Sequence, residues 1–381
     1  MSKLLHTPLT YWHVDAGAKM AEFAGYAMPI NYPTGALKEI KAVREAAGLF
    51  DISHMRPIFV EGTLAREFLN FIDTRDLSKM KIGDARYGIV CEDNGEPIDD
   101  IIVYMLANNR YMVISNASNG TRVVEHLRKV KKDYAISNEQ VKITDGFGEY
   151  GFISLQGPKA ERILGSVANC LVIPKKNYSC APMLPVCGYP ALVAKTGYTG
   201  EEGFEILCKK DTARKIWTKL LEVGEPLGLI PCGLASRDTL RLEAGMPLFG
   251  HEMDKDHDPI TAGLGRYVDF NKHGYFLGKT ALEKVRDGKT KWRTYLLAYI
   301  MEKGRIPRHG DSVYFRHDHI SEYSEIGKLT SGGFSPTLGK NIAMGFSELS
   351  LFVGDEVFVQ IGGKLSPATV TKLPFYKRAK K

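Results

Sequence analysis

Apolar and polar residues alternate in the first third of the chain, the period-two pattern of half-buried β-strands. The pattern predicts strands at Tyr87–Cys91, Ile98–Leu106 and Arg110–Asn116. Asp93-Asn94-Gly95 separates the first two strands and Asn108-Asn109 the last two, and both are turn-forming sequences. We therefore expect a three-stranded antiparallel meander here.

Apolar residues recur every three or four positions elsewhere, which is the pattern of an amphipathic helix. One such stretch lies between Thr34, which can cap a helix, and Gly48, which can end one. A second runs from Asp211, another capping residue, to Gly224. We expect a helix in each stretch.

Strands and helices then follow in the order strand–helix–strand–strand–helix. The strands are expected at Phe152–Leu155, Ala191–Lys195 and Phe204–Leu207, and the first helix at Lys159–Leu164, with the helix that begins at Asp211 completing the order. This order is that of a split βαβ, ferredoxin-like unit. From about residue 290 onward, short strands alternate with Gly, Pro and Ser turns, which indicates a small all-β region.

Length and charge narrow the possible classes of protein. A chain of 381 residues is long enough for two or three domains with buried cores. Its 51 Lys and Arg against 44 Asp and Glu give a net charge of +7, which is mild for this length. Because no basic stripe with interleaved aromatic residues is present, we expect no nucleic-acid binding. We also expect no membrane association, since no apolar run reaches the roughly 20 residues of a spanning helix.

Cysteine usage and the N-terminus suggest a compartment. The six cysteines form no C-x-x-C pair and no zinc spacing, so we expect reduced thiols and no metal. The N-terminal residues show neither a long apolar stretch nor an Arg- and Ser-rich leader. We expect a cytoplasmic protein, or a mature form whose leader has been removed. A weakly basic surface suits an acidic protein partner or an anionic cofactor.

Acidic residues at the start of the middle strand are the most informative candidates for chemistry. Strands are depleted in Asp, yet Asp99 and Asp100 open this one. Since alternate residues share a face, Asp100 and Tyr104 point to one side together, and Asp99 points to the other. With Tyr87 of the preceding strand, one face combines a carboxylate with two phenols, which suits a flat polar heterocycle. The alternative is a pair of turn-flanking acids beside an ordinary strand.

Other segments are less specific. The glycine-rich stretch 196–205 does not fit the dinucleotide pattern, which requires a strand before it and a helix after it. A later helix carries Arg237, Asp238 and Arg241, which form either a buried ion-pair network or an anion clamp. His317-Asp318-His319 has metal-like spacing but no third ligand nearby, so we interpret it as a solvated loop.

Taken together, these segments resemble the aminomethyltransferase family of the glycine cleavage system, the T-proteins. The resemblance runs nearly end to end. The matching segments, in chain order, are 7–9, 17–20, 23–25, 42–44, 48–55, 98–104, 155–158, 196–205, 237–245 and 330–339.

The resemblance implies an α+β fold, a three-domain cloverleaf around a central tetrahydrofolate site. Residues 1–55 and 146–285 would form a discontinuous, ferredoxin-like first domain that binds folate. Residues 56–145 would form a small, mixed, β-rich second domain, the antiparallel meander that carries the catalytic aspartate. Residues 286–381 would form a C-terminal β-barrel-like domain.

The resemblance also assigns site residues. It implies that Asp100 is catalytic and that folate is bound by Tyr87, Ile102, Tyr104, Asn116, Tyr198, Glu205 and Arg237. A carboxylate such as Glu205 can accept hydrogen bonds from both the ring N–H and the amino group of a pterin. Tetrahydrofolate is then a co-substrate, and no metal is expected.

The implied reaction transfers the methylene of an aminomethyl group, carried on the lipoyl arm of the H-protein, to tetrahydrofolate. Ammonia leaves, and the products are 5,10-methylenetetrahydrofolate and dihydrolipoyl H-protein. The expected partners are the lipoylated H-protein and tetrahydrofolate, in the cytoplasm or, for a mature eukaryotic form, in the mitochondrial matrix.

Two alternatives remain open. One is a tetrahydrofolate-dependent S- or O-demethylase of the same fold. The other is a non-catalytic folate-binding scaffold. Folate-binding iron–sulfur assembly relatives carry a cysteine in the glycine-rich loop where this chain has Gly197, which argues against the scaffold.

Overall fold

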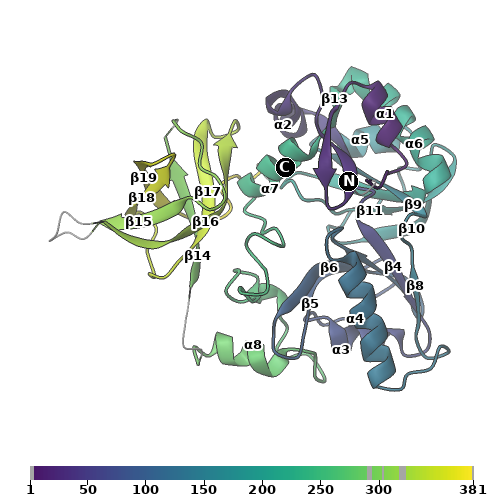
Figure 1. The fold of residues 1–381 in the computed structure, drawn as a ribbon. Helices are drawn as coiled ribbons and strands as arrows, with labels where there is room; N and C mark the ends of the chain where they lie inside the picture. The colour runs from purple at the N-terminus through teal and green to yellow at the C-terminus, as the bar shows by residue number, and fades with distance from the viewer. Residues whose placement is uncertain (1–3, 290–293, 303, 317–322, 380–381) are drawn as a thin grey trace.

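The chain folds into three lobes, each built on its own sheet (Figure 1). The computed structural model describes residues 4–289, 294–302, 304–316 and 323–379. The architecture is the mixed α+β class that the sequence predicts, with a closed six-stranded barrel in the C-terminal region. No helix among the residues described is long and apolar enough to cross a membrane.

The first sheet draws strands from distant parts of the chain. Its strands, in spatial order, are β10 (Cys180–Val186), β11 (Tyr189–Ala194), β12 (Gly203–Lys209), β9 (Tyr150–Gln156), β3 (Ala47–Asp51) and β13 (Leu229–Cys232). All neighbours pair antiparallel except β13 and β3, which are parallel. The sheet therefore joins a segment from before the second sheet to segments from after it, the discontinuity that the resemblance implies.

Helices cover both faces of the first sheet. The helix predicted from Asp211 is α6 (Lys210–Gly224), whose fully buried Trp217 packs in a core with α5 (Ala160–Gly165). On the other face, α2 (Ala36–Glu45) and α7 (Leu234–Glu243) pack together. The N-terminal α1 (Thr10–Asp15) and the hairpin β1 (Lys19–Phe23) and β2 (Tyr26–Asn31) complete the lobe.

The predicted first helix is partly wrong at both ends. Gly35, with a φ of +80°, stands at the N-cap of α2 and no side chain caps it, so Thr34 does not have the expected role. The helix ends at Glu45, and Gly48 lies inside strand β3. A Cβ atom at Gly48 would come within 2.5 Å of Val43 and 2.6 Å of Cys232, so this glycine permits close packing of helix on strand.

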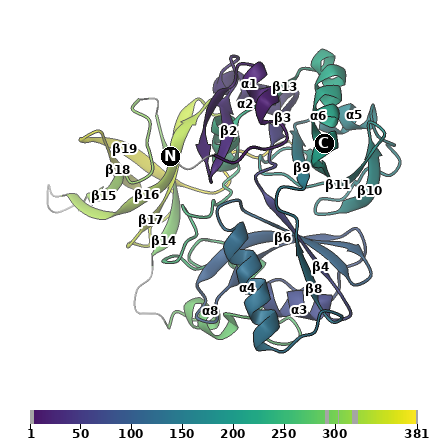
Figure 2. The same ribbon diagram turned by 45° about the vertical axis from the view of Figure 1, so that its right-hand side comes forward.

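The second sheet contains the predicted meander. Its spatial order is β5 (Ala85–Cys91), β6 (Pro97–Ala107), β7 (Arg110–Ser115), β4 (Arg56–Glu61) and β8 (Lys142–Asp145). The antiparallel pairing of β5, β6 and β7 confirms the sequence prediction. Helices α3 (Ala65–Ile72) and α4 (Gly120–Asp133) pack on one face of this sheet, and α4 lies across it in Figure 2.

The segment after α7 crosses from the first lobe to the second. Its apolar residues, among them Val268 and Phe276, pack with Ile89 and Cys91 of β5, and the short α8 (Lys279–Arg286) follows. The chain then enters the barrel, whose strands, in closed order, are β14 (Tyr295–Met301), β17 (Lys340–Ser347), β16 (Tyr323–Ser335), β15 (Ser312–Arg316), β18 (Glu356–Ile361) and β19 (Lys364–Thr371). We propose domain boundaries at residues 55/56, 145/146 and 285/286.

A buried polar cluster joins the barrel to the first lobe. Glu243 of α7 accepts hydrogen bonds from Ser335 at 2.5 Å and Thr337 at 2.9 Å, and pairs with Arg44 of α2 at 2.7 Å. The C-terminal segment crosses this cluster. The backbone N–H of Tyr376 donates to the Glu243 carbonyl, the Arg44 guanidinium lies 4.1 Å from the centre of the Tyr376 ring, and Arg378 pairs with Glu202 at 2.7 Å. The tail thus fastens the end of the barrel to the first lobe.

Candidate active site

Asp100 lies on strand β6 on the face directed toward the first lobe. Tyr104, which is four residues further along the strand and on the same face, packs with Ala194 and Leu207 of the first sheet. Ile101 and Val103, on the opposite face, belong to the core beneath α3 and α4. The alternation predicted from sequence is therefore confirmed.

Two polar side chains hold the Asp100 carboxylate. The Tyr87 hydroxyl donates to Oδ2 at 3.1 Å, and the Asn116 side-chain amide donates to Oδ1 at 2.8 Å. Burial raises the pKa of Asp100, while these two hydrogen bonds oppose the rise. Asp100 is thus a carboxyl group that can hold a proton more readily than an exposed aspartate.

Tyr87 is a fixed donor in this arrangement. Its ring makes an edge contact with Tyr267, with ring centroids 4.6 Å apart. Burial raises the pKa of Tyr87 well above its usual value, and the nearby Asp100 charge adds to the effect. The phenol therefore stays protonated and donates to Asp100 throughout the physiological range.

A second carboxylate faces this region from the first sheet. Glu205 of β12 accepts a 2.5 Å hydrogen bond from Thr196, whose hydroxyl also lies 3.4 Å from that of Tyr104. Burial raises the pKa of Glu205, while the Thr196 hydrogen bond and the Arg237 charge oppose the rise. Thr196 thus connects a residue of the second sheet with a carboxylate of the first.

The two arginines of α7 have different surroundings. Arg241 pairs with Glu252 at 2.9 Å and Asp238 at 2.8 Å, so it is the ion-pair network that the sequence left as one alternative. The Arg237 guanidinium carbon lies 5.0 Å from the centre of the Tyr198 ring. Its Nη1 atom is buried with no hydrogen-bond partner among the residues described, so it is available to a ligand. This contrast favours Arg237 for the anion-binding role.

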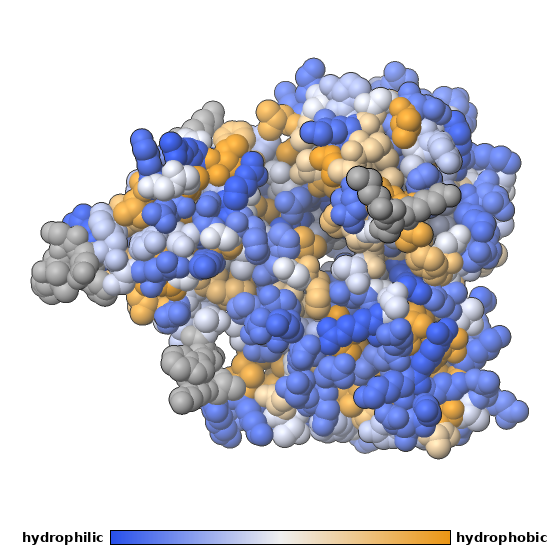
Figure 3. All heavy atoms as spheres, in the orientation of Figure 1, coloured by the Kyte–Doolittle hydropathy of each residue, from blue (hydrophilic) through white to orange (hydrophobic). Residues whose placement is uncertain are grey.

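The Tyr198 phenol lies near charged residues of two lobes, Asp100 of the second lobe and Arg237 and Arg241 of the first. Burial raises its pKa above its usual value; the charges of Arg241 and Arg237 lower it, and that of Asp100 raises it. Because these charges act on one phenol, Asp100 and Arg237 both lie near Tyr198. Half-buried Ile102 also lies on the Asp100 face, opposite Tyr87 in the neighbouring strand. These contacts link the eight residues expected in the site, and Figure 3 shows a hollow between the lobes.

Sequence reasoning missed several residues of this region. Thr196 was not singled out within the glycine-rich stretch, and Tyr267 gave no signal at all. His54 is buried, its Nδ1 has no partner in the described structure, and burial lowers its pKa to about 4. The Arg237 charge contributes to this shift, so His54 lies near the same region. It occurs in a segment matching the family, but nothing in the local pattern distinguished it.

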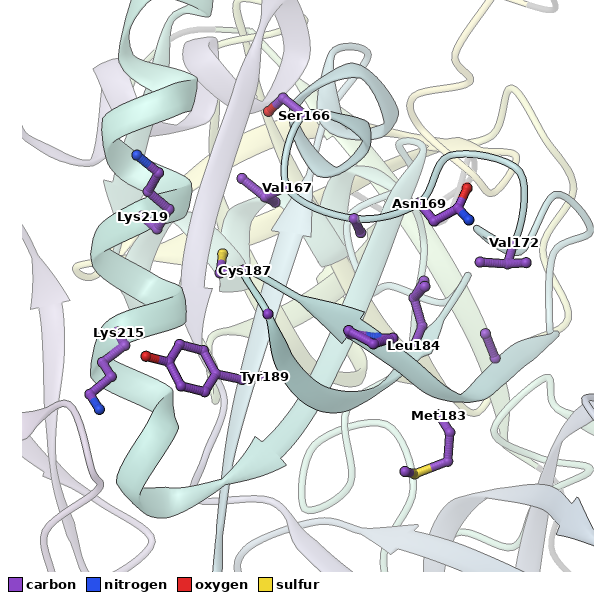
Figure 4. Close-up of a pocket in the computed structure, with 14 residues that line it drawn as sticks. Ser166, Val167, Asn169, Val172, Met183, Leu184, Cys187, Tyr189, Lys215 and Lys219 are labelled. Carbon is purple, nitrogen blue, oxygen red and sulfur yellow. The ribbon is translucent and has the colours of Figure 1, made fainter.

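A pocket of about 950 Å³ lies elsewhere in the first lobe. It is formed between α6 and strands β10 and β11, and none of the expected site residues lines it (Figure 4). Lys215 lies over the Tyr189 ring at 5.3 Å, and Lys219 pairs with Glu222 at 2.6 Å. Both lysines already have a partner, so this pocket offers no cation comparable to Arg237, whose Nη1 is unpaired.

The sequence predicts no metal site. Within the described ranges, no group of three or more His, Cys, Asp or Glu side chains could hold a metal ion. The His317-Asp318-His319 segment lies outside those ranges. The donor set at the junction consists of two separate carboxylates, phenols, an amide and a guanidinium. It fits an organic ligand bearing several N–H groups and a negative charge.

A half-buried carboxylate, a second, buried carboxylate and a guanidinium with an unpaired buried nitrogen lie near the junction of the lobes, and this combination favours a site for a small organic molecule with N–H groups and a negative charge. Residues 9–272 match the family model described as GCVT N-terminal domain, and residues 296–377 match the glycine cleavage T-protein C-terminal barrel domain. The chain belongs to the glycine cleavage T-protein family of aminomethyltransferases.

Individual relatives agree along the whole length. An aminomethyltransferase of Symbiobacterium thermophilum is 39% identical over 378 residues, covering 98% of each chain. That of Streptomyces coelicolor is 41% identical over 382 residues, covering 100% of this chain and 99% of the relative. The crystal structure of glycine cleavage system aminomethyltransferase T from Bartonella henselae superposes with a TM-score of 0.86 at 32% identity, covering 98% of this chain and 99% of that one.

Family membership makes the chain an enzyme, a transferase whose family uses tetrahydrofolate as substrate. It also implies folate and the H-protein as partners. The demethylase and the scaffold, which the sequence left open, are not favoured by these relatives.

Proposed function

We propose that the chain transfers the methylene group of an aminomethyl-lipoyl H-protein to tetrahydrofolate. Ammonia is released, and the products are 5,10-methylenetetrahydrofolate and dihydrolipoyl H-protein. The two N–H hydrogens that folate loses appear as one on ammonia and one on the released thiol, so the reaction needs no external oxidant or reductant. The observation that carries the proposal is the half-buried Asp100 carboxyl, held by Tyr87 and Asn116, whose charge acts on the Tyr198 phenol together with that of Arg237.

Asp100 is the proposed catalytic residue. Its raised pKa brings it closer to the pH at which a carboxyl group can both accept and return a proton. In its ionised form it stabilises the positive charge that develops as the amine departs. The hydrogen bonds from Tyr87 and Asn116 fix its orientation, so little reorganisation is needed during the reaction.

The remaining residues bind and orient folate. Glu205 accepts from the ring N–H and amino group of the pterin, a charge-assisted and directional pair of hydrogen bonds. The Arg237 charge favours the ionised form of Glu205 against the effect of burial, and its free Nη1 donates to an acceptor of the ligand. Tyr198 and Ile102 supply the aromatic and aliphatic walls, which exclude water from the electrophilic carbon, and fully buried Tyr104 supports the site from the core.

The proposed location is the cytoplasm. All six cysteines are free, and this suits a reducing compartment. The lipoylated H-protein is the proposed donor partner, and the mild positive charge of the chain is suited to an acidic protein.

The test is an assay with tetrahydrofolate and aminomethyl-loaded H-protein. We expect methylenetetrahydrofolate and ammonia in equal amounts. A demethylase would instead give a demethylated product from a methyl donor and no ammonia. Folate binding without either product would leave only the scaffold.

A further inference from the structure

Asp99 is a fully buried carboxylate that the proposed mechanism does not use. Its Oδ2 accepts the backbone N–H of Asn116 at 2.8 Å, and its Oδ1 accepts the Asn116 side-chain amide at 2.8 Å. A third donor, the side-chain amide of Asn119, reaches Oδ1 at 2.7 Å. Asp99 therefore accepts hydrogen bonds from both the main chain and the side chain of Asn116.

The Asn116 amide bridges the two neighbouring carboxylates. Its nitrogen lies 2.8 Å from Oδ1 of Asp99 and 2.8 Å from Oδ1 of Asp100, so each of its two hydrogens has an acceptor. A flip of the amide would replace the nitrogen that donates to both carboxyl groups with a carbonyl oxygen, which has no hydrogen to donate. The bond to Asp99 thus determines which end of the amide faces Asp100.

We infer that Asp99 is a positioning residue: through Asn116, it fixes the donor that orients the Asp100 carboxylate in the reaction. The inference rests on the proposed function of Asp100. Asp99 touches no substrate in this scheme, because it lies on the opposite face of β6, toward the start of α4. Its effect on the reaction therefore passes through a single intermediate side chain.

A purely structural role is the competing explanation. Asn119 stands at the N-cap of α4, so the Asp99–Asn119 bond also anchors the start of that helix. The two roles use different partners. Asn119→Ala removes the anchoring bond and leaves both Asn116 contacts, so it is the matched control.

The experiment compares full-length Asp99→Asn, Asn116→Ala, the double variant and Asn119→Ala in the assay with aminomethyl-loaded H-protein. In Asp99→Asn one acceptor oxygen remains where two were present, so either the Asn116 backbone N–H or the side-chain amides of Asn116 and Asn119 meet an NH2 group in place of an acceptor. This mismatch weakens the control of the orientation of the Asn116 side chain. We expect kcat to fall by about 10- to 100-fold, while the KM for tetrahydrofolate changes by less than about threefold. The kcat of the double variant should equal that of Asn116→Ala, because Asp99 acts through that residue. Asn119→Ala should keep kcat within about threefold while lowering the thermal unfolding midpoint.

Three results would overturn the inference: a wild-type kcat in Asp99→Asn, multiplicative losses in the double variant, or a loss in Asn119→Ala as large as that in Asp99→Asn. If Asp99→Asn does not fold, Asp99→Ser takes its place, since its smaller hydroxyl can still accept the Asn116 backbone N–H, and the same outcomes apply. If the wild-type chain yields neither methylenetetrahydrofolate nor ammonia, the proposed function itself is refuted. A result with the variants alone bears only on the role of Asp99.

Discussion

The Tyr87 hydroxyl reaches Asp100 diagonally across two strands. In the antiparallel register, Tyr87 lies opposite Ile102, and Asp100 lies opposite Ile89. The 3.1 Å hydrogen bond therefore joins residues two positions apart in register, on one face of the sheet. A long aromatic side chain spans that separation, and the carboxylate is held without a partner directly opposite it.

Removing the Asp100 charge is expected to stop turnover while leaving the fold intact. Asparagine has nearly the same shape, but it neither carries the charge nor takes up a proton. For Asp100→Asn we expect kcat to fall by about two orders of magnitude or more, with tetrahydrofolate affinity within about threefold. Turnover with aminomethyl-loaded H-protein and calorimetric binding of folate measure the two quantities. Exposed Asp211 supplies the control Asp211→Asn, and an unchanged rate in Asp100→Asn would remove Asp100 from the mechanism.

Tyr87→Phe is expected to change the pH dependence of the reaction. The Tyr87 hydrogen bond favours the ionised form of Asp100 and lowers its pKa. Without that bond the pKa of Asp100 rises, so a higher pH is needed to ionise the group. We therefore expect the acidic limb of the kcat–pH profile to move to higher pH. Tyr11→Phe, at a tyrosine that is 67% exposed, is the control, and a limb that stays in place or moves to lower pH contradicts the assignment.

Glu205→Gln is expected to weaken folate binding more than it slows the reaction. Glutamine can still accept from Thr196, but its neutral amide presents hydrogens to the N–H groups of the pterin. A charge-assisted hydrogen bond contributes about 1.5–3 kcal/mol, so the KM for tetrahydrofolate should rise by about 10- to 100-fold. The kinetic constants of Glu205→Gln and of the exposed control Glu225→Gln test this expectation. A normal KM would place the pterin elsewhere.

Association with the H-protein should weaken as salt is added. Exposed basic residues on α4, among them Arg128, Lys129 and Lys132, add to the net positive charge of the chain. Salt screens attraction between exposed charges, so the Kd should rise severalfold between about 50 and 300 mM NaCl. Calorimetry at both concentrations checks the change. A Kd independent of salt would mean that electrostatic attraction does not bring the two proteins together.

The local pattern of apolar and polar residues predicted the meander, whose strands follow one another along the chain. The meander β5–β6–β7 has short turns and strict alternation, so its strands and the face that carries Asp100 could be derived from the residues. Strand β10 was missed, and Gly48 was interpreted as a helix end. Gly48 belongs to β3, which becomes a strand by pairing with the distant strands β9 and β13, and local spacing carries no record of that pairing. Strand β10 pairs with its neighbour β11, but its two prolines are atypical of a strand and weaken the local pattern.

The candidate site, too, could be predicted only in part from the local sequence. The resemblance supplied residues from both lobes, but periodicity alone could not bring Glu205 or Arg237 to the face of Asp100. The link from Asp99 to Asn116 depends on how the loop after β7 folds back beside β6. That geometry exists only after the strands have paired. The sequence could therefore predict that Asp99 and Asp100 lie on opposite faces of the strand, but not which residues each of them contacts.

The docked tail affects how the protein can be handled. Tyr376 and Arg378 are held by Arg44, Glu243 and Glu202, close to the glycine-rich stretch that leads into Glu205. A purification tag or fluorescent fusion joined to the C-terminus would load these anchors and the loop beside the proposed folate site. Fusions for affinity capture or imaging are therefore better attached at the other end of the polypeptide.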